Sequence, residues 1–447
     1  MTTYVASPPN YLELAGRIGP ARLVELMQLG ITENGGEYVH WDKLRQLETP
    51  ANVSLEEWWF LIKWRRQSVQ RVIPLTDPSG APFVYGVPDL VARRLHCVDQ
   101  RCSGEVAMSE VVTADEQARQ HYLVNSLMEE AIRSSQLEGA TTTRRVAKEL
   151  LRSGREPTDR SERMIVNNYR ALQYMRDGMP DELTPATVLE LQRILTDGTL
   201  DNPDAAGRLQ RPDEVRIAVV DSTDGSVIHR PPPADQLPAR LQALCDFANE
   251  GESPERFIHP VVRAILLHFW LAYDHPFEDG NGRTARALFY WYMKSRRYWL
   301  VEYLSISKIL RDAPARYTRS FVLTETDERD VTYFLVYQLD VIQRAVEQLH
   351  KYLRQKIKDV RDVEKLLKKG SNQFNHRQLA LLGNALRTPD AVYTFQTHAS
   401  THGVTHETAR NDLLPLVQMG FLEQRRPGRR YAFTPPNNLP ERLKASQ

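Results

Sequence analysis

The chain has 447 residues, 41% of them hydrophobic and 26% charged, and its 58 basic and 57 acidic residues almost cancel. This is the composition of an ordinary soluble globular protein, long enough for two or three domains. The near-zero net charge therefore favours no particular class of partner.

Basic residues concentrate toward the C-terminal end. Residues 351–447 contain 17 Lys and Arg against 8 Asp and Glu, a net charge of +9, which leaves −8 for residues 1–350. We therefore expect a basic C-terminal module attached to an acidic body.

The three cysteines, Cys97, Cys102 and Cys245, cannot form a disulfide framework, and no set of Cys and His residues has metal-ligand spacing. The start of the chain lacks the basic and apolar regions of a secretory leader, and no apolar run reaches membrane-spanning length. The expected location is cytoplasmic, with no membrane partner.

Residues 1–110 mix helices with a hairpin. Apolar residues have helical spacing over 12–29, and Ser54 begins another helix in which Glu57 closes a capping box. The apolar residues of that second helix are predicted to be core: Trp58, Trp59, Leu61, Ile62 and Trp64. Two β-prone runs, 72–75 and 83–85, flank a turn and predict a hairpin. No chemistry is assigned to this region.

A clear amphipathic helix is predicted over 116–137. It ends in Ser134-Ser-Gln-Leu-Glu138-Gly139, where Gly139 is well placed as a C-terminal cap. By itself this is the pattern of an ordinary helix end.

The middle of the chain is predicted to be helical, with one hairpin. The predicted helices are 144–151, 162–175, 185–195, 236–249 and 260–273. The last of them is apolar nearly all round and should be buried. Asn167 and Asn168 are expected to make buried hydrogen bonds. Two short β-prone runs, 215–220 and 227–229, flank a turn-rich loop and predict the hairpin.

The stretch His275–Arg286 combines groups that bind phosphate. It reads His-Pro-Phe-Glu-Asp-Gly-Asn-Gly-Arg-Thr-Ala-Arg and precedes an apolar helical run. The glycines on either side of Asn281 allow positive φ and a close backbone approach, and the helix that starts near Gly282 offers unpaired N–H groups to an anion. Arg283 and Arg286 share one helix face, where both can bind phosphate oxygens.

The same stretch contains a base and a metal ligand. Asp279 is a hard oxygen ligand of the kind that Mg²⁺ bridging two phosphates requires. His275 is the one group there that accepts a proton near neutral pH. The alternative is a loop whose glycines only cap a helix and whose arginines are solvated, and the presence of all these groups in one register makes it improbable. We therefore predict a phosphate site.

At every defining position this stretch resembles the signature of the Fic family, His-x-Phe-x-(Asp/Glu)-Gly-Asn-Gly-(Arg/Lys)-x-x-Arg. The resemblance implies a mainly α fold, a Fic helical core with a β-hairpin flap. It also implies transfer of AMP from ATP, with release of pyrophosphate, to a Ser, Thr or Tyr hydroxyl of a target protein or of the chain itself.

The resemblance also implies a role for each motif residue. His275 would be the catalytic base, Phe277 would pack inward, and Asp279 would hold Mg²⁺ between the α- and β-phosphates. ATP would be bound by Gly280, Asn281, Gly282, Arg283, Thr284, Ala285 and Arg286, the first three at the α-phosphate, Arg283 at the β-phosphate and Arg286 at the γ-phosphate. Asp274 departs from the aliphatic residue usual in the family, and it either raises the pKa of His275 or points to solvent.

The end of the helix 116–139 resembles the family's inhibitory sequence, (Ser/Thr)-x-x-x-Glu-(Gly/Asn), through Ser134, Glu138 and Gly139. In such proteins the glutamate pairs with the second arginine of the motif, here Arg286. The pairing occupies the γ-phosphate position and forces ATP into an unproductive pose. The resemblance thus implies autoinhibition in cis.

The hairpin 215–230 resembles the flap of Fic enzymes, whose exposed edge pairs with the backbone of the target and delivers its hydroxyl toward the histidine. Val227, Ile228 and His229 are the predicted target-binding positions. Arg316-Tyr317 resembles a position near the adenine, but Thr318 replaces the second tyrosine usual there, so the adenine contacts stay open.

The C-terminal part resembles a winged-helix domain, a common attachment to bacterial Fic proteins. A long helix is predicted from Asp330 into a Lys-rich stretch. Ala399–Gly403 and Thr405–Met419 then resemble a helix-turn-helix, and 421–433 a β-hairpin wing. The residues predicted to be exposed on the third helix and wing are His406, Arg410, Asn411, Arg425, Arg426, Arg429 and Arg430. They suit DNA backbone contact, yet winged helices also serve in protein docking or as dimer modules, so DNA binding and a homodimer both stay open.

The predicted organisation has four parts. They are an N-terminal Fic-associated region (1–110), a Fic domain (111–350) with the inhibitory helix 116–139 and the flap 215–230, a basic linker helix (351–370) and a winged-helix domain (371–447).

The leading functional hypothesis is a protein adenylyltransferase, a nucleotidyltransferase autoinhibited by Glu138 pairing with Arg286. One alternative is a de-AMPylase, in which Glu138 positions a water at the same site. Another is a winged-helix transcriptional regulator whose Fic core only senses nucleotide. The intact motif favours an enzyme through His275, Asp279, Arg283 and Arg286, since a pure sensor would not need the histidine. Transfer of UMP or phosphocholine is a rarer alternative.

Overall fold

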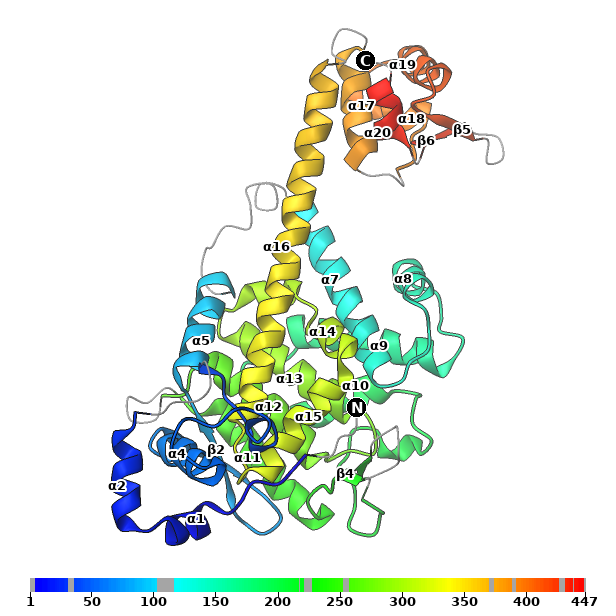
Figure 1. Ribbon diagram of the computed structural model, residues 1–447. Helices are drawn as coiled ribbons and strands as arrows, with labels where there is room; N and C mark the ends of the chain where they lie inside the picture. The colour runs from blue at the N-terminus through cyan, green and yellow to red at the C-terminus, as the bar shows by residue number, and fades with distance from the viewer. Residues whose placement is uncertain are drawn as a thin grey trace. The chain divides into compact units, whose positions relative to one another are not determined.

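The computed structural model describes residues 5–30, 36–102, 116–216, 218–220, 227–251, 257–369, 374–387, 391–425, 431–436 and 438–445. Over these residues the chain is mainly helical, with three two-stranded antiparallel sheets (Figure 1). It divides into two compact units, residues 1–349 and 350–447, and the finer boundaries expected from the sequence stay predictions. None of the helices in the described part is long and apolar enough to cross a membrane.

The N-terminal region consists of α1 (Tyr11–Ile18), α2 (Pro20–Gln28), α3 (Trp41–Leu44), α4 (Leu55–Gln67), β1 (Gln70–Thr76), β2 (Pro82–Gly86) and α5 (Asp89–Cys102). The single helical stretch expected over 12–29 is two helices, because Gly19 adopts φ +77 and Pro20 follows it. The capping box of Ser54 and Glu57 and the hairpin β1–β2 are confirmed. Trp64 was expected in the core, but it lies on the outer face of α4 and is 41% exposed.

A buried polar network attaches this region to the rest of the first unit. Lys63 Nζ lies 2.7 Å from Asp327 Oδ1, and the hydroxyl of Tyr333 donates to Asp327 Oδ2 at 2.7 Å. Arg66 Nη1 donates to the same tyrosine at 2.5 Å.

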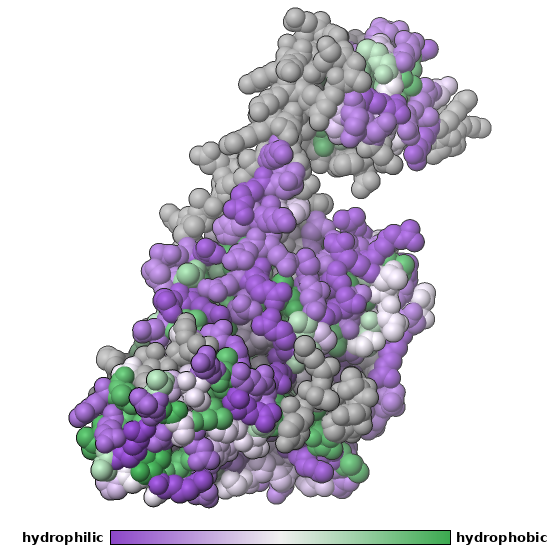
Figure 2. All heavy atoms as spheres, in the orientation of Figure 1, coloured by the Kyte–Doolittle hydropathy of each residue, from purple (hydrophilic) through white to green (hydrophobic). Residues whose placement is uncertain are grey.

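In Figure 2 exposed hydrophobic side chains gather over the N-terminal helices, where Leu12 is 76% exposed.

The remaining helices of the first unit are α7 (Glu116–Leu137), α8 (Arg144–Ser153), α9 (Arg160–Asp177), α10 (Pro185–Thr196), α11 (Leu237–Asn249), α12 (Pro260–Asp274), α13 (Asn281–Ser295), α14 (Ile306–Asp312), α15 (Pro314–Thr326) and α16 (Thr332–Lys369), the last of which extends past the unit boundary. Short 3₁₀ turns cover Pro203–Ala205, Ala234–Gln236 and Trp299–Tyr303, and the second hairpin is β3 (Val219–Val220) with β4 (Val227–His229).

Helices α12 and α13 form the centre of this unit (Figure 1). As expected from its apolar sequence, α12 is buried along nearly its whole length. Helix α13 also contacts α9 and α10, and α7 packs on α9 and α14. Asn167 and Asn168 of α9 are buried and donate to backbone oxygens of Asp197 (2.7 Å) and Ala131 (3.1 Å), which confirms their structural role. The loop between α12 and α13 is therefore supported by packed helices.

The second unit contains α17 (His376–Arg387), α18 (Phe395–His402), α19 (His406–Gln418), β5 (Glu423–Arg425), β6 (Ala432–Thr434) and α20 (Leu439–Ala445). Its own core includes Leu382, Leu413 and Phe433. Gly403, at φ +62, turns the chain between α18 and α19. The expected wing residues Arg426, Arg429 and Arg430 lie outside the described residues, and the winged-helix assignment stays a prediction.

Candidate active site

Helix α12 ends in a left-handed turn that presents His275. His275 has φ +46 and ψ +54, and its N–H donates to Leu271 O at 3.0 Å. A non-glycine residue in this region is strained, so the surrounding structure must hold it there. The chain thus leaves the helical direction at His275, while α12 itself stays buried.

The imidazole of His275 is half-buried, and burial is the main reason that its pKa is lowered to about 4. Its Nδ1 lies 3.4 Å from Ala272 O, an acceptor only, so Nδ1 carries the hydrogen. The neutral ring therefore has its lone pair on Nε2 at pH 7. This is the form that a general base requires.

The expectation that Asp274 points to solvent is wrong. Its carboxylate is buried; Oδ1 accepts from Arg240 Nε at 2.8 Å and Oδ2 from Trp270 Nε1 at 3.0 Å. The side chain thus points into the core, and Asp274 is not among the main groups that shift the pKa of His275, which is lowered and not raised. Burial raises the pKa of Asp274 itself, although Arg240 opposes this.

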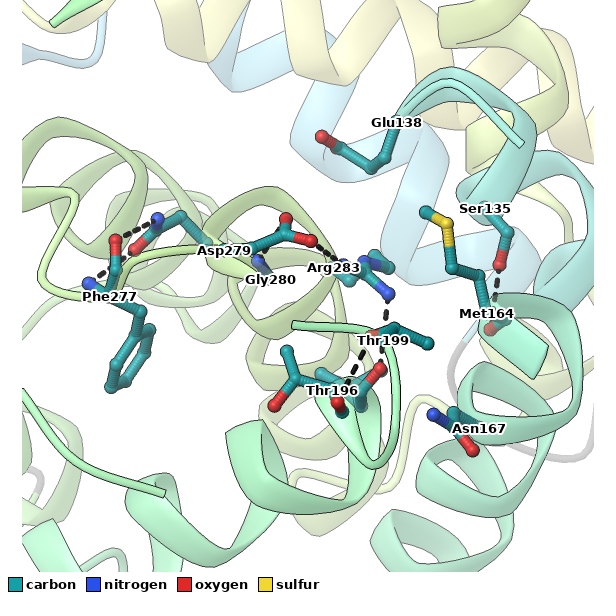
Figure 3. Close-up of polar contacts among 12 residues, drawn as sticks. Ser135, Glu138, Met164, Asn167, Thr196, Thr199, Phe277, Asp279, Gly280 and Arg283 are labelled. Carbon is teal, nitrogen blue, oxygen red and sulfur yellow. Dashed lines mark hydrogen bonds and ion pairs between the residues drawn. The ribbon is translucent and has the colours of Figure 1, made fainter. Parts of the chain in front are cut away.

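Asn281 closes the loop after His275 on itself. Its Oδ1 accepts from the Phe277 N–H at 2.9 Å and its Nδ2 donates to Phe277 O at 2.8 Å, while the Phe277 ring is fully buried (Figure 3). From α10, Gln192 Nε2 donates to Asp279 O at 3.0 Å. The loop is therefore braced from within and from a neighbouring helix.

The two glycines of the motif serve different needs. Gly280 has φ +86, and a Cβ there would lie 2.9 Å from Thr196 Cγ2. Gly282 is helical and does not use the positive φ open to a glycine, and a Cβ on it would overlap the carboxylate of Glu138. Gly282 thus keeps the N-terminus of α13 open to close approach by an oxygen ligand. The N–H groups of the first turn of α13 have no partner within the helix and can bind an anion there.

Arg283 and Asp279 contact each other. Arg283 Nη2 lies 3.0 Å from Asp279 Oδ2, and Nη1 donates to Leu195 O at 3.1 Å, with the arginine side chain fully buried (Figure 3). The Gly280 N–H donates to Asp279 Oδ1 at 2.5 Å. The side chain of Asp279 remains 35% exposed. Arg283 therefore orients Asp279, and its role at a phosphate stays a prediction.

Asp279 has the chemistry of a Mg²⁺ ligand. Magnesium is usually held by one or two carboxylates together with substrate phosphates and water. Within the described part of the chain no three or more His, Cys, Asp or Glu side chains gather as a metal cage. One accessible carboxylate beside an anion site fits a cation that arrives with the nucleotide.

Helix α7 ends at this site and covers Arg286. Arg286 Nη2 lies 2.8 Å from Glu138 Oε1, Nε donates to Ser134 Oγ at 3.0 Å, and Nη2 donates to Ser134 O at 3.2 Å. The arginine side chain is 1% exposed and that of Glu138 is 29% exposed. Gly139 has φ +95 and ends the helix as predicted. The expected pairing of Glu138 with Arg286 is present.

Thr284 and Ala285 are fully buried, and the Thr284 N–H already donates to Gly280 O at 2.8 Å. The hydroxyl of Tyr317 lies 2.8 Å from His268 Nε2 on α12. Neither arrangement tests the predicted nucleotide contacts, which stay predictions.

The hairpin β3–β4 pairs Val219 with His229. Val227 is 46% exposed, whereas the His229 ring is buried, with Nε2 2.7 Å from Tyr273 O and Nδ1 3.0 Å from Glu325 Oε2. His229 thus anchors the strand. Target binding by Val227, Ile228 and His229 stays a prediction, and the turn of the flap, 221–226, lies outside the described residues.

Comparison with known proteins identifies the domain that contains this site. Residues 182–293 match the Fic/DOC family. The chain is 45% identical over 60 residues to the protein adenylyltransferase Fic of Nematostella vectensis, covering 13% of this chain and 14% of that protein. It is 28% identical over 209 residues to the protein of the same name from Drosophila willistoni, covering 45% and 38%. The chain thus spans less than half the length of these curated relatives.

The fold is shared with a solved structure. The crystal structure of a Fic family protein from Desulfovibrio desulfuricans G20 covers 78% of this chain and 95% of its own, with a TM-score of 0.50 and 20% identity.

Proposed function

We propose that this chain, which contains a Fic domain, is a protein adenylyltransferase that moves AMP from ATP to a Ser, Thr or Tyr hydroxyl of a target protein or of itself. The observation that carries the proposal is the loop between α12 and α13. Within a few residues it joins a neutral imidazole, an accessible carboxylate and a helix N-terminus open to close approach. These are a base, a cation ligand and an anion site.

In the proposed mechanism the triphosphate lies at the N-terminus of α13, where N–H groups and the helix dipole favour negative charge. Asp279 would hold Mg²⁺, which neutralises phosphate charge when bound. His275 Nε2 takes the proton of the target hydroxyl as that oxygen forms a bond to Pα. The bond from Pα to the oxygen that bridges to Pβ breaks, and pyrophosphate leaves.

We also propose that Glu138 inhibits this reaction in cis. Its carboxylate pairs with Arg286 and lies over Gly282, at the same end of α13 that the phosphates would use. An anion cannot enter this position while another anion occupies it. Freeing Arg286 would therefore restore productive ATP binding.

The test is the intact mass of purified Glu138→Gly protein after incubation with ATP and Mg²⁺. We expect a gain of one AMP, with a rate about 5- to 150-fold above wild type, the usual range of coupling between sites. Adding His275→Ala should lower the rate by about 100- to 10,000-fold, because it removes the base.

Glu156→Gly, at an exposed acid, controls for the loss of a negative charge and the added glycine. Equal labelling of wild type and Glu138→Gly would reject inhibition. Absence of both AMP transfer and pyrophosphate release in Glu138→Gly would reject the transferase. If wild type instead removed AMP from a modified protein and Glu138→Gly did not, the site would be assigned to AMP removal.

For the second unit we propose binding to duplex DNA. The support is the α18–turn–α19 arrangement, with Arg410 and Asn411 exposed on α19, and the net charge of +9 over residues 351–447. Fluorescence anisotropy with a random-sequence duplex should show binding that weakens steeply between low and high salt. Arg410→Ala should weaken binding more than Arg442→Ala, and no binding at low salt would reject the proposal.

A further inference from the structure

We infer that Arg216 is a positioning residue that ties the flap to the His275 turn, an inference that rests on the proposed transferase function. The motif assigns nothing to Arg216, which precedes β3 and is half-buried. Its guanidinium donates to two successive carbonyls at the end of α12, Asp274 O at 2.8 Å and His275 O at 3.1 Å. It therefore holds the backbone of the base itself.

The same guanidinium binds both ends of the hairpin. Nε donates to Pro232 O, after β4, at 2.9 Å, and Nη1 donates to Gln210 Oε1, before β3. A guanidinium is planar and has five donors in a fixed fork, so its four contacts constrain one another. A shift at either base of the flap thus acts on the carbonyls of Asp274 and His275.

Neighbouring contacts continue this pattern along the chain. The Tyr273 carbonyl lies 2.7 Å from His229 Nε2 on β4, and the Pro276 carbonyl accepts from the Gln210 N–H at 2.9 Å. The four carbonyls of residues 273–276 are therefore all bonded by residues of the flap or of the segment before it. No other part of the candidate site is attached to the flap so continuously within the described residues.

The physical need for these donors follows from the end of α12. The last carbonyls of a helix have no partner within it, and a cation there interacts favourably with the helix dipole. The left-handed φ of His275 is unfavourable for a residue with a side chain and persists only where neighbours hold it. Arg216 supplies both the donors and the charge, so it sets the direction of the imidazole.

The consequence for function is that flap and base move together. A target that pairs with the flap would hold residues 216 and 232, and through them the turn that aims His275. Arg216 then affects the rate of transfer and leaves ATP binding at α13 unchanged.

The experiment compares Arg216→Met with its parent, Glu138→Gly, so that inhibition is absent from both. We expect kcat for AMP transfer to fall by about 10- to 100-fold, as for small misplacements of a catalytic group, while KM for ATP changes less than twofold. Arg208→Met is the matched control, because Arg208 lies in the same segment but pairs with Glu214 at 2.6 Å. It should keep the kcat of the parent.

Arg216→Lys tests the fork without losing the charge. We expect a kcat between those of the parent and Arg216→Met, and it decides the question if the methionine variant fails to fold. Parental kcat in Arg216→Lys, or in a folded Arg216→Met, would overturn the inference. So would an equal loss in Arg208→Met.

A second measurement separates this inference from the proposed function. With ¹³C-labelled histidine, the imidazole signal of His275, assigned by its absence in His275→Ala, should shift in Arg216→Met and stay in place in Arg208→Met. If the parent transfers no AMP but this signal shifts, the transferase proposal fails and the positioning role stands. An unmoved signal rejects the positioning role whatever the activity.

Discussion

The loop between α12 and α13 and the end of α7 both lie at the N-terminal end of α13, yet they are held in different ways. The loop is braced by the two hydrogen bonds of Asn281 to Phe277, by Gln192 on Asp279 O and by the ion pair of Asp279 with Arg283. Among the described residues, the hydrogen bonds and the ion pair that join the end of α7 to the site are those of Ser134 and Glu138, and they converge on Arg286.

The part of α7 before its last turn is held in place by contacts of its own. Glu130 is buried and accepts from Ser305 Oγ at 2.9 Å and from the Ser307 N–H at 3.1 Å. The difference teaches that the site is built in advance and then covered by one turn of helix. The proposed inhibition would therefore be relieved at Glu138 without unfolding α7 and without rebuilding the loop.

Asn281→Ala should change the rate of AMP transfer most, because it removes the two hydrogen bonds that hold the loop. We expect AMP transfer in the Glu138→Gly background to fall by about 100-fold, since the base and the anion site lose their relative position. Loss of two buried hydrogen bonds should also lower the free energy of unfolding by about 1–3 kcal/mol. Initial rates and urea unfolding measure the two effects.

The matched control for Asn281→Ala is Asn249→Ala. Asn249 makes a similar pair of bonds, from Nδ2 to Leu183 O at 2.7 Å and from the Leu183 N–H to Oδ1 at 2.8 Å, away from the site. It should lose comparable stability and keep its rate. If the transfer rate falls equally in both variants, the loss follows from lower overall stability and not from the hydrogen bonds of the loop. The contrast between the loop and the end of α7 would then fail.

Ser134→Ala should have a smaller effect, in the opposite direction. It removes the bond from Arg286 Nε to Ser134 Oγ but leaves the backbone carbonyl and Glu138 in place. A hydrogen bond is worth about 1 kcal/mol net, so we expect AMP transfer to rise about fivefold above wild type. Ser135→Ala is the control, because Ser135 Oγ donates to Met164 O and not to Arg286. A gain equal to that of Glu138→Gly would show that the serine and not the carboxylate is the main restraint.

The sequence predicted the parts of the site that lie close together in the chain. Helix, loop and helix follow from the apolar run before His275 and the glycines after it, and the cap at Gly139 follows from its position after an amphipathic helix. Pairing of Glu138 with Arg286, across 148 residues, required the resemblance to Fic proteins.

Other supports of the site were not predicted. Gln192, Arg216 and Arg240 are single polar residues without a motif. Each contacts the loop or the end of α12 only because a segment distant in the sequence packs beside it. Asp274 was misjudged for the same reason, since its partners come from α11 and from α12 itself. Their one signal in the sequence is a polar side chain among apolar neighbours, which says that a partner exists and does not say which.

The pH dependence of the AMP transfer rate should be the smallest of these effects. It concerns His275 and thus the loop between α12 and α13. Burial lowers the pKa of His275 to about 4, so the imidazole is neutral, and competent as a base, throughout the neutral range. In the Glu138→Gly background we expect the rate to change less than twofold between pH 6 and 8 and to fall only as the pH approaches about 4. Removing Glu138 also removes a charge that raises this pKa, so the fall should not move to higher pH.

The free energy of unfolding should also fall as the pH is lowered. Because the folded pKa lies below the ordinary value, the unfolded chain binds more protons between about pH 4 and 6.5, and the contribution of His275 to stability is lost as pH falls through that window. Urea midpoints at pH 7 and 5 for the parent and for His275→Ala measure it, and the drop should be smaller in the variant. An activity loss centred near pH 6.5 would mean that solvent reaches the imidazole of His275. The turn at the end of α12 would then be no more closed to solvent than the turn that covers Arg286.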